Sequence, residues 1–283
     1  MASHLIEKES NSAVDQKRFA FIELMIIWEG QVNAAHISQQ FELGVKLAAH
    51  VIQKYKNLYP ENIEYHAVTE SYITSKTMVA QFTGGSLQEY VQLIANGESV
   101  TQLAMPTRNV NPNLVRPILQ AIREQRRLSI AYASVSHPEF KTRIIQPHNI
   151  VYDGLRWHVR AYCEKNQGYR DFVLSRFNAE TPSELLDAAD HYDLEDKLWQ
   201  TILDLEIIPD PRLDKNRCRI IALDYDMEPS AENPYVKVMK VRAALLMYLI
   251  NRLGLDQYHN KPEAQQIILS PDCQQLLKPY MPS

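Results

Sequence analysis

The feature that most constrains this chain is a change in the spacing of its apolar residues near Leu128. Before that point, apolar side chains recur every three or four residues, as they do on one face of a helix. After it, they alternate with polar side chains in short runs, as they do in half-buried strands. A helical part followed by a strand-rich part predicts an α+β protein, and a length of 283 residues favours more than one domain.

The N-terminal part predicts three short helices followed by a hairpin. The expected helices cover residues 15–28, 34–41 and about 45–59. Gly30 stops the first helix, Asn33 caps the second, and Pro60 ends the third. The expected hairpin strands cover residues 63–66 and 72–74. The side chains of the third helix that should pack inward are Leu47, Val51, Ile52 and Tyr55.

No acidic side chain interrupts residues 45–56 of the third helix. A helix that enters the major groove needs donors on its outer face, and a carboxylate there would be repelled by the phosphates. The segment therefore indicates a winged helix-turn-helix that binds DNA. An ordinary solvated helix in a three-helix core is the alternative. The candidate DNA-contacting residues are Asn33, Lys46, Leu47, His50, Gln53, Lys54, Lys56 and Ser71.

Further helices and strands are expected downstream of this segment. A capping box at Ser86 opens a helix that closes at Gly97, and another helix covers residues 113–127 with Pro117 in its first turn. The expected strands that follow cover residues 128–133, 142–151, 156–163 and 169–177. Four short strands at this spacing suggest a small antiparallel barrel. The C-terminal region should combine a strand that runs from Trp199 and ends at Pro209 with helices over residues 213–223 and 241–253.

The charge of the chain is unevenly distributed. Residues 116–176 carry eleven basic and five acidic side chains, whereas residues 177–283 carry eleven basic and eighteen acidic ones. Arg170 and Arg176 are six residues apart in one expected strand, so both should project to the same face. Arg156 and Arg160 should likewise share a face of the neighbouring strand.

A cluster of arginines that lacks acidic partners in its own domain fits an anion. Arginine binds phosphate or carboxylate through two parallel hydrogen bonds, and Trp157 or Tyr152 is available to stack on a base. A nucleotide or a single-stranded nucleic acid would suit such a site. The alternative is a domain interface in which these arginines pair with acids of the C-terminal region. The two can coexist, because a ligand that displaces an acid would act as a switch.

Residues 143–177 resemble the WYL domain of bacterial regulators, which is a small Sm-like β-barrel. The triplet that names the family is Trp157-His158-Val159 here, which departs from Trp-Tyr-Leu, and the two family arginines correspond to Arg170 and Arg176 in "YRDFVLSR". The run "PHNIVYDGLRWHVRAYC" is most similar to regulators of anti-phage defence operons of the BrxR and CapW type. The resemblance extends to "ISQQFELGVKLAAHVIQKYKNLYPENIEY" as a winged helix and to residues 199–256 as the C-terminal extension called WCX.

The resemblance implies a winged helix-turn-helix in residues 1–85, a helical linker in 86–127, a WYL domain in 128–180 and a WCX domain in 181–283. It also implies a homodimer that binds a palindromic double-stranded operator and represses a phage-defence operon (BREX or CBASS-like). An anionic or nucleotide effector at the WYL domain would release the operator. A ligand-dependent activator and an RNA-binding Sm-like module are the alternatives. The candidate effector-binding residues are Tyr132, Ser134, Arg143, His148, Trp157, His158, Arg160, Arg170 and Arg176.

The sequence carries no motif of an enzyme, a metal site or a cofactor site. A P-loop, GxGxxG, HExxH and GxSxG are all absent, and the nine histidines and three cysteines lack the spacing of metal ligands. We therefore expect neither catalysis nor a cofactor. His148 and His158 fit hydrogen bonding in a pocket better than acid–base chemistry. No apolar run approaches the roughly 20 residues of a membrane span, so a cytoplasmic protein without a membrane partner is expected.

Overall fold

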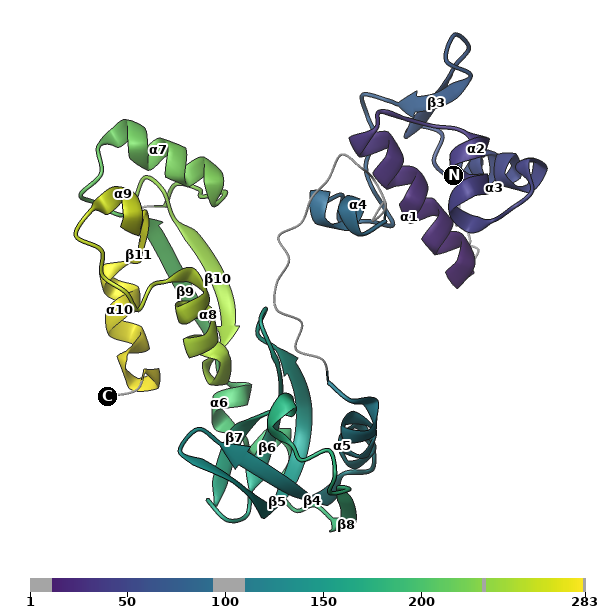
Figure 1. The fold of residues 1–283 in the computed structure, drawn as a ribbon. Helices are drawn as coiled ribbons and strands as arrows, with labels where there is room; N and C mark the ends of the chain where they lie inside the picture. Colours follow the sequence, from purple (N-terminus) through teal and green to yellow (C-terminus); the bar gives the residue numbers. More distant parts are fainter. Residues whose placement is uncertain (1–11, 94–109, 231–232, 282–283) are drawn as a thin grey trace, which may run out of the picture. The chain divides into compact units, whose positions relative to one another are not determined.

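The computed structural model describes residues 12–93, 110–230 and 233–281. The chain divides into two compact units, residues 1–105 and residues 106–283, which are described separately below (Figure 1). The helix predicted from Ser86 is present as α4, Leu87–Leu93, and its predicted end near Gly97 lies outside the described residues.

The first unit contains the predicted helices and hairpin. Its helices are α1 Ala13–Trp28, α2 Ala34–Phe41 and α3 Val45–Leu58, followed by α4. Its strands are β1 Gln31–Val32, β2 Ile63–His66 and β3 Ser71–Thr74, in the antiparallel order β1-β3-β2. Strand β1 is not predicted by the sequence, because two residues are too few to show alternation. Helix, turn, helix and hairpin in this order form a winged helix-turn-helix.

The core of the first unit lies between α1, α3 and the hairpin. Phe19, Ile22, Ile52 and Tyr55 are fully or almost fully buried there. The inward face of α3 differs from the prediction at one position: Leu47 is 47% exposed, and Ala48 is buried instead. The correction follows from helix geometry, because position 48 lies three and four residues before Val51 and Ile52 and so shares their face.

The second unit begins with α5, Pro112–Glu124, which packs beside β4, β5 and β8 (Figure 1). Asn111 caps this helix, and Pro112 occupies a first-turn position that suits proline. Pro117 is inside the helix, and the prediction that it lies in the first turn is wrong because that turn of about 3.6 residues ends before it. Gln125 has a left-handed backbone conformation and ends the helix, so residues 126 and 127 belong to the next strand.

Five strands of the second unit form one antiparallel sheet. They are β4 Arg126–Ser134, β5 His137–Tyr152, β6 Trp157–Cys163, β7 Gly168–Val173 and β8 Glu184–Ala188, in the order β7-β6-β5-β4-β8. The apolar core on one face includes Leu128, Ile145, Val159 and Phe172. The predicted barrel is not closed, because the edge strands β7 and β8 do not pair with each other in the described structure. A single bridge, Tyr132 to Phe177, joins β4 to the chain that follows β7.

The predicted strand over residues 169–177 is interrupted. Strand β7 ends at Val173, and Leu174–Arg176 forms a short 3₁₀ helix, η1. Phe172, Val173 and Leu174 are all buried, which a regular strand cannot achieve on one face since its side chains alternate. Arg170 and Arg176 therefore do not lie on one strand.

The C-terminal part of the second unit is a small α+β fold. Its strands are β9 Ile202–Pro209, β10 Lys237–Arg242 and β11 Ile267–Leu269, in the antiparallel order β10-β9-β11. Its helices are α6 Lys197–Gln200, α7 Lys215–Asp224, α8 Leu246–Leu253, α9 Pro262–Gln265 and α10 Pro271–Leu277, with 3₁₀ turns η2 Asp193–Glu195, η3 Ala243–Leu245 and η4 Lys278–Tyr280.

Two elements of this part differ from their predicted form. Trp199 lies in helix α6 and not in a strand, because the Asp196 carboxylate accepts a hydrogen bond from the Trp199 N–H and caps the turn. Val241 lies in β10, so α8 is shorter than the predicted helix over residues 241–253. Leu205, Leu246 and Ile250 are buried in the core between sheet and helices.

Candidate nucleic-acid interface and effector site

Helix α3 presents a polar face free of acids on the outside of the winged helix. Lys46, Leu47, His50 and Gln53 are exposed on this face, while Val51 and its neighbours pack inward. Residues separated by three or four positions share a helix face, so Lys46, His50 and Gln53 form one row. These three side chains supply a cation, an imidazole and an amide, which can contact phosphates and base edges in a major groove.

The two lysines near the end of α3 are half-buried and already in contact with other side chains. The Lys54 ammonium donates to the Asp15 carboxylate of α1 at 2.8 Å, and this hydrogen bond holds the pKa of Asp15 below its ordinary value. The Lys56 ammonium lies 5.4 Å from the centre of the Tyr72 ring in the hairpin. Both lysines lie beside the exposed row of α3, at its edge.

Two of the sequence candidates use their polar groups within the winged helix. The Asn33 side chain accepts hydrogen bonds from the N–H groups of Ala35 and His36 and caps α2. Ser71 is buried, and its hydroxyl donates to the Thr69 carbonyl at 2.9 Å. A DNA contact by either residue stays a prediction.

The hairpin adds exposed residues that the sequence pattern did not single out. Tyr65 is 53% exposed on β2, His66 is exposed at the end of that strand, and Lys76 is exposed two residues after β3. The signal that could have found Lys76 is its position just beyond the predicted hairpin, where a wing approaches the phosphate backbone.

The candidate effector residues lie on two opposite faces of the central sheet. Directly opposed residues on paired antiparallel strands share a face. Arg143 opposes the buried Ile130, and Arg170 opposes the buried Ala161, so both arginines lie on the face that carries the apolar core. We call this the core face, and the other side of the sheet the outer face.

The other candidates of the core face differ in exposure. Tyr132 is buried, and its hydroxyl accepts a hydrogen bond from the Val173 N–H. Trp157 is 43% exposed at the start of β6, where the centre of its ring lies 4.7 Å from that of the exposed Tyr152. Ser134 ends β4, and its hydroxyl accepts from the N–H of His137 in the β4–β5 turn.

The outer face carries a buried network of charges centred on Arg160. The Arg160 guanidinium donates to both carboxylate oxygens of Asp196, at 2.7 and 3.1 Å, and to the Asp171 carboxylate at 3.3 Å. The His148 ring lies 3.2 Å from the Asp196 carboxylate. The second oxygen of Asp171 accepts a hydrogen bond from the hydroxyl of Tyr248 in α8. The network therefore joins the central sheet to the C-terminal fold.

His158 lies at the edge of this network. Its Nε2 is 2.7 Å from the Asp153 carboxylate, and its ring centre is 4.9 Å from that of Tyr248. Its Nδ1 is buried and has no hydrogen-bond partner in the described structure. The Arg156 guanidinium also reaches Asp153, at 3.4 Å.

Two acids of the outer face, Asp196 and Asp153, have lowered pKa values despite their burial. Burial raises the pKa of Asp196, but the hydrogen bond and the charge of Arg160 outweigh it, so the pKa lies below its ordinary value. Burial likewise opposes ionisation of Asp153, but the hydrogen bond from His158 together with the backbone hydrogen bonds from Arg156 and Leu155 lowers the pKa. Arg160 is therefore paired with two carboxylates on the outer face. The prediction that the arginines of this domain lack acidic partners is wrong for this residue.

Three candidate arginines remain without an ion-pair partner among the described residues: Arg143, Arg170 and Arg176. Arg170 is exposed, and Arg176 is half-buried in η1. Arg143 donates to the Asn166 side chain at 3.1 Å, but its Nε is buried without a partner. Because the sheet separates Arg143 and Arg170 from His148, His158 and Arg160, a single small ligand cannot contact all nine candidates.

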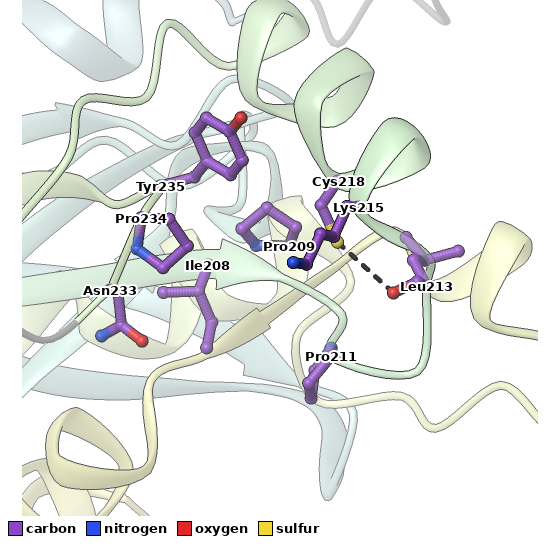
Figure 2. A pocket seen from close by; sticks show the side chains of 9 residues that line it. All are labelled: Ile208, Pro209, Pro211, Leu213, Lys215, Cys218, Asn233, Pro234 and Tyr235. Carbon is purple, nitrogen blue, oxygen red and sulfur yellow. Dashed lines mark hydrogen bonds between the residues drawn. The ribbon is translucent and has the colours of Figure 1, made fainter.

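The C-terminal fold contains an apolar cavity of about 510 Å³ between β9 and α7 (Figure 2). Aliphatic and proline side chains form most of its wall, and Lys215 and Asn233 supply the polar groups. The Cys218 thiol contacts the Leu213 carbonyl at 3.6 Å, and burial raises its pKa. Across the described residues, no group of three His, Cys, Asp or Glu side chains could hold a metal ion. None of the described helices is both long enough and apolar enough to cross a membrane.

A winged helix with an acid-free third helix, followed by a WYL-type sheet and an α+β C-terminal fold, defines a class of transcriptional regulator. Three family models match the chain in the same order. Residues 15–96 match the BrxR transcriptional regulator winged helix-turn-helix domain, residues 113–181 match the WYL domain, and residues 202–276 match the BrxR transcriptional regulator C-terminal dimerization domain.

Two similar proteins, each aligned over most of its length, agree with these matches. A DNA-binding transcriptional repressor CapW of Pseudomonas aeruginosa is 31% identical over 272 residues, which cover 90% of this chain and 88% of that protein. A CapW repressor of Escherichia coli (strain KTE188) is 30% identical over 275 residues, with the same coverage of 90% and 88%. The chain therefore belongs to the BrxR and CapW family of transcriptional regulators, which confirms the resemblance.

One solved structure, the proteasome accessory factor B/C of Arthrobacter aurescens, aligns over 99% of this chain and 51% of that chain at 14% identity. Its TM-score of 0.26 is too low for the alignment to bear on fold or function.

Proposed function

We propose that this protein is a dimeric, sequence-specific DNA-binding repressor. The observation that carries the proposal is the exposed row of Lys46, His50 and Gln53 on the third helix of a winged helix, with no acid along that helix. Membership of a family whose relatives are named DNA-binding transcriptional repressors supports it. We place its site of action in the bacterial cytoplasm, where an operator is accessible.

The dimer is proposed from the match of residues 202–276 to a dimerization domain. A two-fold symmetric protein imposes two-fold symmetry on its site, so the operator should be a palindrome with half-sites about one helical turn apart, or a multiple of that distance. We further propose that the operator controls a phage-defence operon, as the family resemblance implies.

The effector is proposed to be an anion, such as a nucleotide or a short nucleic acid, bound on the core face of the central sheet. Arg143 and Arg170 on this face, and Arg176 in η1 just after β7, support this site because the described structure gives them no carboxylate partner, whereas Arg160 has two. The rings of Tyr152 and Trp157, which contact each other, are exposed and offer a surface on which a base could stack.

Footprinting on the DNA upstream of the protein's own gene tests the proposed function. We expect a protected region with two-fold symmetry, and deletion of residues 1–75 should abolish the protection. A single asymmetric half-site would argue against the dimer. RNA binding that survives the deletion, without any duplex protection, would replace the repressor by an RNA-binding module. A reporter fused to the protected promoter then gives the sign of regulation.

A further inference from the structure

Asp15 is the acidic side chain in direct contact with the basic edge of α3. It lies in the first turn of α1, where its N–H donates to the hydroxyl of the capping residue Ser12. Its carboxylate accepts from the Lys54 ammonium at 2.8 Å and lies 3.9 Å from the Arg18 guanidinium. The side chain of Asp15 is 17% exposed and that of Lys54 is 39% exposed, so the pair lies at the surface.

Lys54 is placed where a phosphate backbone would pass. It lies four residues after His50 and next to Gln53, at the edge of the exposed row of α3. A helix that lies in the major groove is flanked by the two phosphate backbones, and lysines at its edge contact phosphates without reading bases. In the structure, the ammonium of Lys54 donates to the Asp15 carboxylate.

A basic residue on the other side of Asp15 is also incompletely satisfied. The Nε of Arg18 is buried and has no hydrogen-bond partner within the described structure, and a terminal nitrogen of its guanidinium lies 3.9 Å from the Asp15 carboxylate. Asp15 therefore offsets the charge of two cations at this corner of the winged helix.

We propose that Asp15 limits the sequence-independent part of DNA binding by holding Lys54 away from the phosphate backbone. This inference rests on the proposed function, since it concerns the same DNA-binding surface. A phosphate must compete with the Asp15 carboxylate for Lys54, so part of the electrostatic attraction is lost for every sequence. Limiting this attraction keeps the regulator from being held at random sites, which outnumber the operator in a genome.

The test compares Asp15→Asn with the parent protein on a random-sequence duplex and on the footprinted site, over a series of salt concentrations. Asp15→Asn should bind both duplexes more tightly, with a salt dependence that is steeper by about 0.9, as expected for one additional phosphate contact. The gain in affinity should therefore shrink by about 3.5-fold between 50 and 200 mM salt. The conservative variant Asp15→Glu should restore binding close to that of the parent.

Two further variants separate the route through Lys54 from a general effect of charge. Glu61→Gln removes one exposed carboxylate from the same domain without a contact to Lys54, and it should leave the salt dependence unchanged. In a Lys54→Gln background, Asp15→Asn should have no further effect. An equal gain in that background would overturn the inference, as would a loss of affinity in a folded Asp15→Asn protein.

Thermal unfolding of each variant shows whether the domain is intact. If the parent protein binds neither duplex, the proposed function itself fails, and this inference fails with it. If the parent binds DNA and Asp15→Asn leaves affinity and salt dependence unchanged, only the inference fails.

Discussion

The Arg160 guanidinium and the Asp196 carboxylate face each other through two hydrogen bonds of 2.7 and 3.1 Å, and both residues are at least 95% buried. Arg160 belongs to strand β6 of the central sheet, and Asp196 caps helix α6 at the start of the C-terminal fold. Removal of one partner of a buried ion pair destabilises a protein strongly, because the other charge is left buried without its partner. Loss of either Arg160 or Asp196 should therefore weaken the attachment of the central sheet to the C-terminal fold.

Arg160→Met should destabilise the protein by about 3–5 kcal/mol, because it leaves the buried carboxylates of Asp196 and Asp171 without their cation. The measurement is urea unfolding at a fixed protein concentration, since the stability of a dimer depends on concentration. Arg170→Ala is the matched control: this arginine is exposed and has no ion pair in the described structure, so its loss should change stability by about 0.5 kcal/mol or less. Equal effects of the two substitutions would show that the Arg160 network does not hold the fold.

The stability that Asp196 contributes should depend on pH. Its pKa in the folded protein is lowered from the ordinary value of 3.8, so folding favours the charged carboxylate. The stabilisation is complete above the ordinary pKa and is lost as the pH falls through the lower, folded value. The difference in unfolding free energy between the parent and Asp196→Asn should therefore be constant near neutral pH and shrink below pH 3.8. A difference that stays the same down to pH 2.5 would contradict this account.

The sequence predicted the winged helix well because its signals are local. Asn33, Gly30 and Pro60 mark helix ends by their own backbone preferences, and the apolar spacing of α3 identifies its buried face. The error at Leu47 is an error of one helix position: Leu47 lies four residues before Val51, but Ala48 shares the face of both Val51 and Ile52 and is the buried residue.

The site on the central sheet was predicted less well because it depends on long-range contacts. Nothing in the local pattern shows that Arg160 meets Asp196, which lies 36 residues further along the chain. The separation of Arg170 and Arg176 also depends on burial of Leu174, which bends the chain out of strand β7. Strand β11 has only three residues and was missed for the same reason as β1. Strand β10 has six residues, and its end from Val241 was assigned to the following helix.

Lys46→Ala and His50→Ala should each weaken operator binding by about 1–3 kcal/mol if they contact base edges, with a smaller effect on random-sequence DNA. The reason is that both side chains project from the exposed face of α3, where they can reach a major groove. Binding titrations on the operator and on a scrambled duplex give the comparison. Lys141→Ala, which removes an exposed lysine of the central sheet, serves as a control that should leave both affinities unchanged. If neither α3 substitution alters operator binding, the assignment of α3 as the recognition helix is wrong.

The final prediction concerns release of the operator by the effector. A ligand can shift an equilibrium only by its different affinity for two conformations, and a 100-fold loss of operator affinity requires about 2.7 kcal/mol of coupling. One or two charge-assisted hydrogen bonds formed in only one conformation can supply this amount, at about 1.5–3 kcal/mol each. Arg170 and Arg176 are suited to this role because neither has a carboxylate partner within the described structure, so an anion can bind without first displacing one.

Arg170→Ala and Arg176→Ala should therefore keep operator binding in the absence of the effector and lose release in phage-infected cells. The measurements are an operator titration of each purified variant and a promoter reporter with and without phage. Arg160 would be an unsuitable test residue, because its loss breaks the buried network of the outer face and so destabilises the fold. A folded Arg170→Ala protein that no longer binds the operator would place this arginine on the DNA surface or in a structural interface. Normal release by both variants would show that the anion binds elsewhere, and the site on the core face would have to be abandoned.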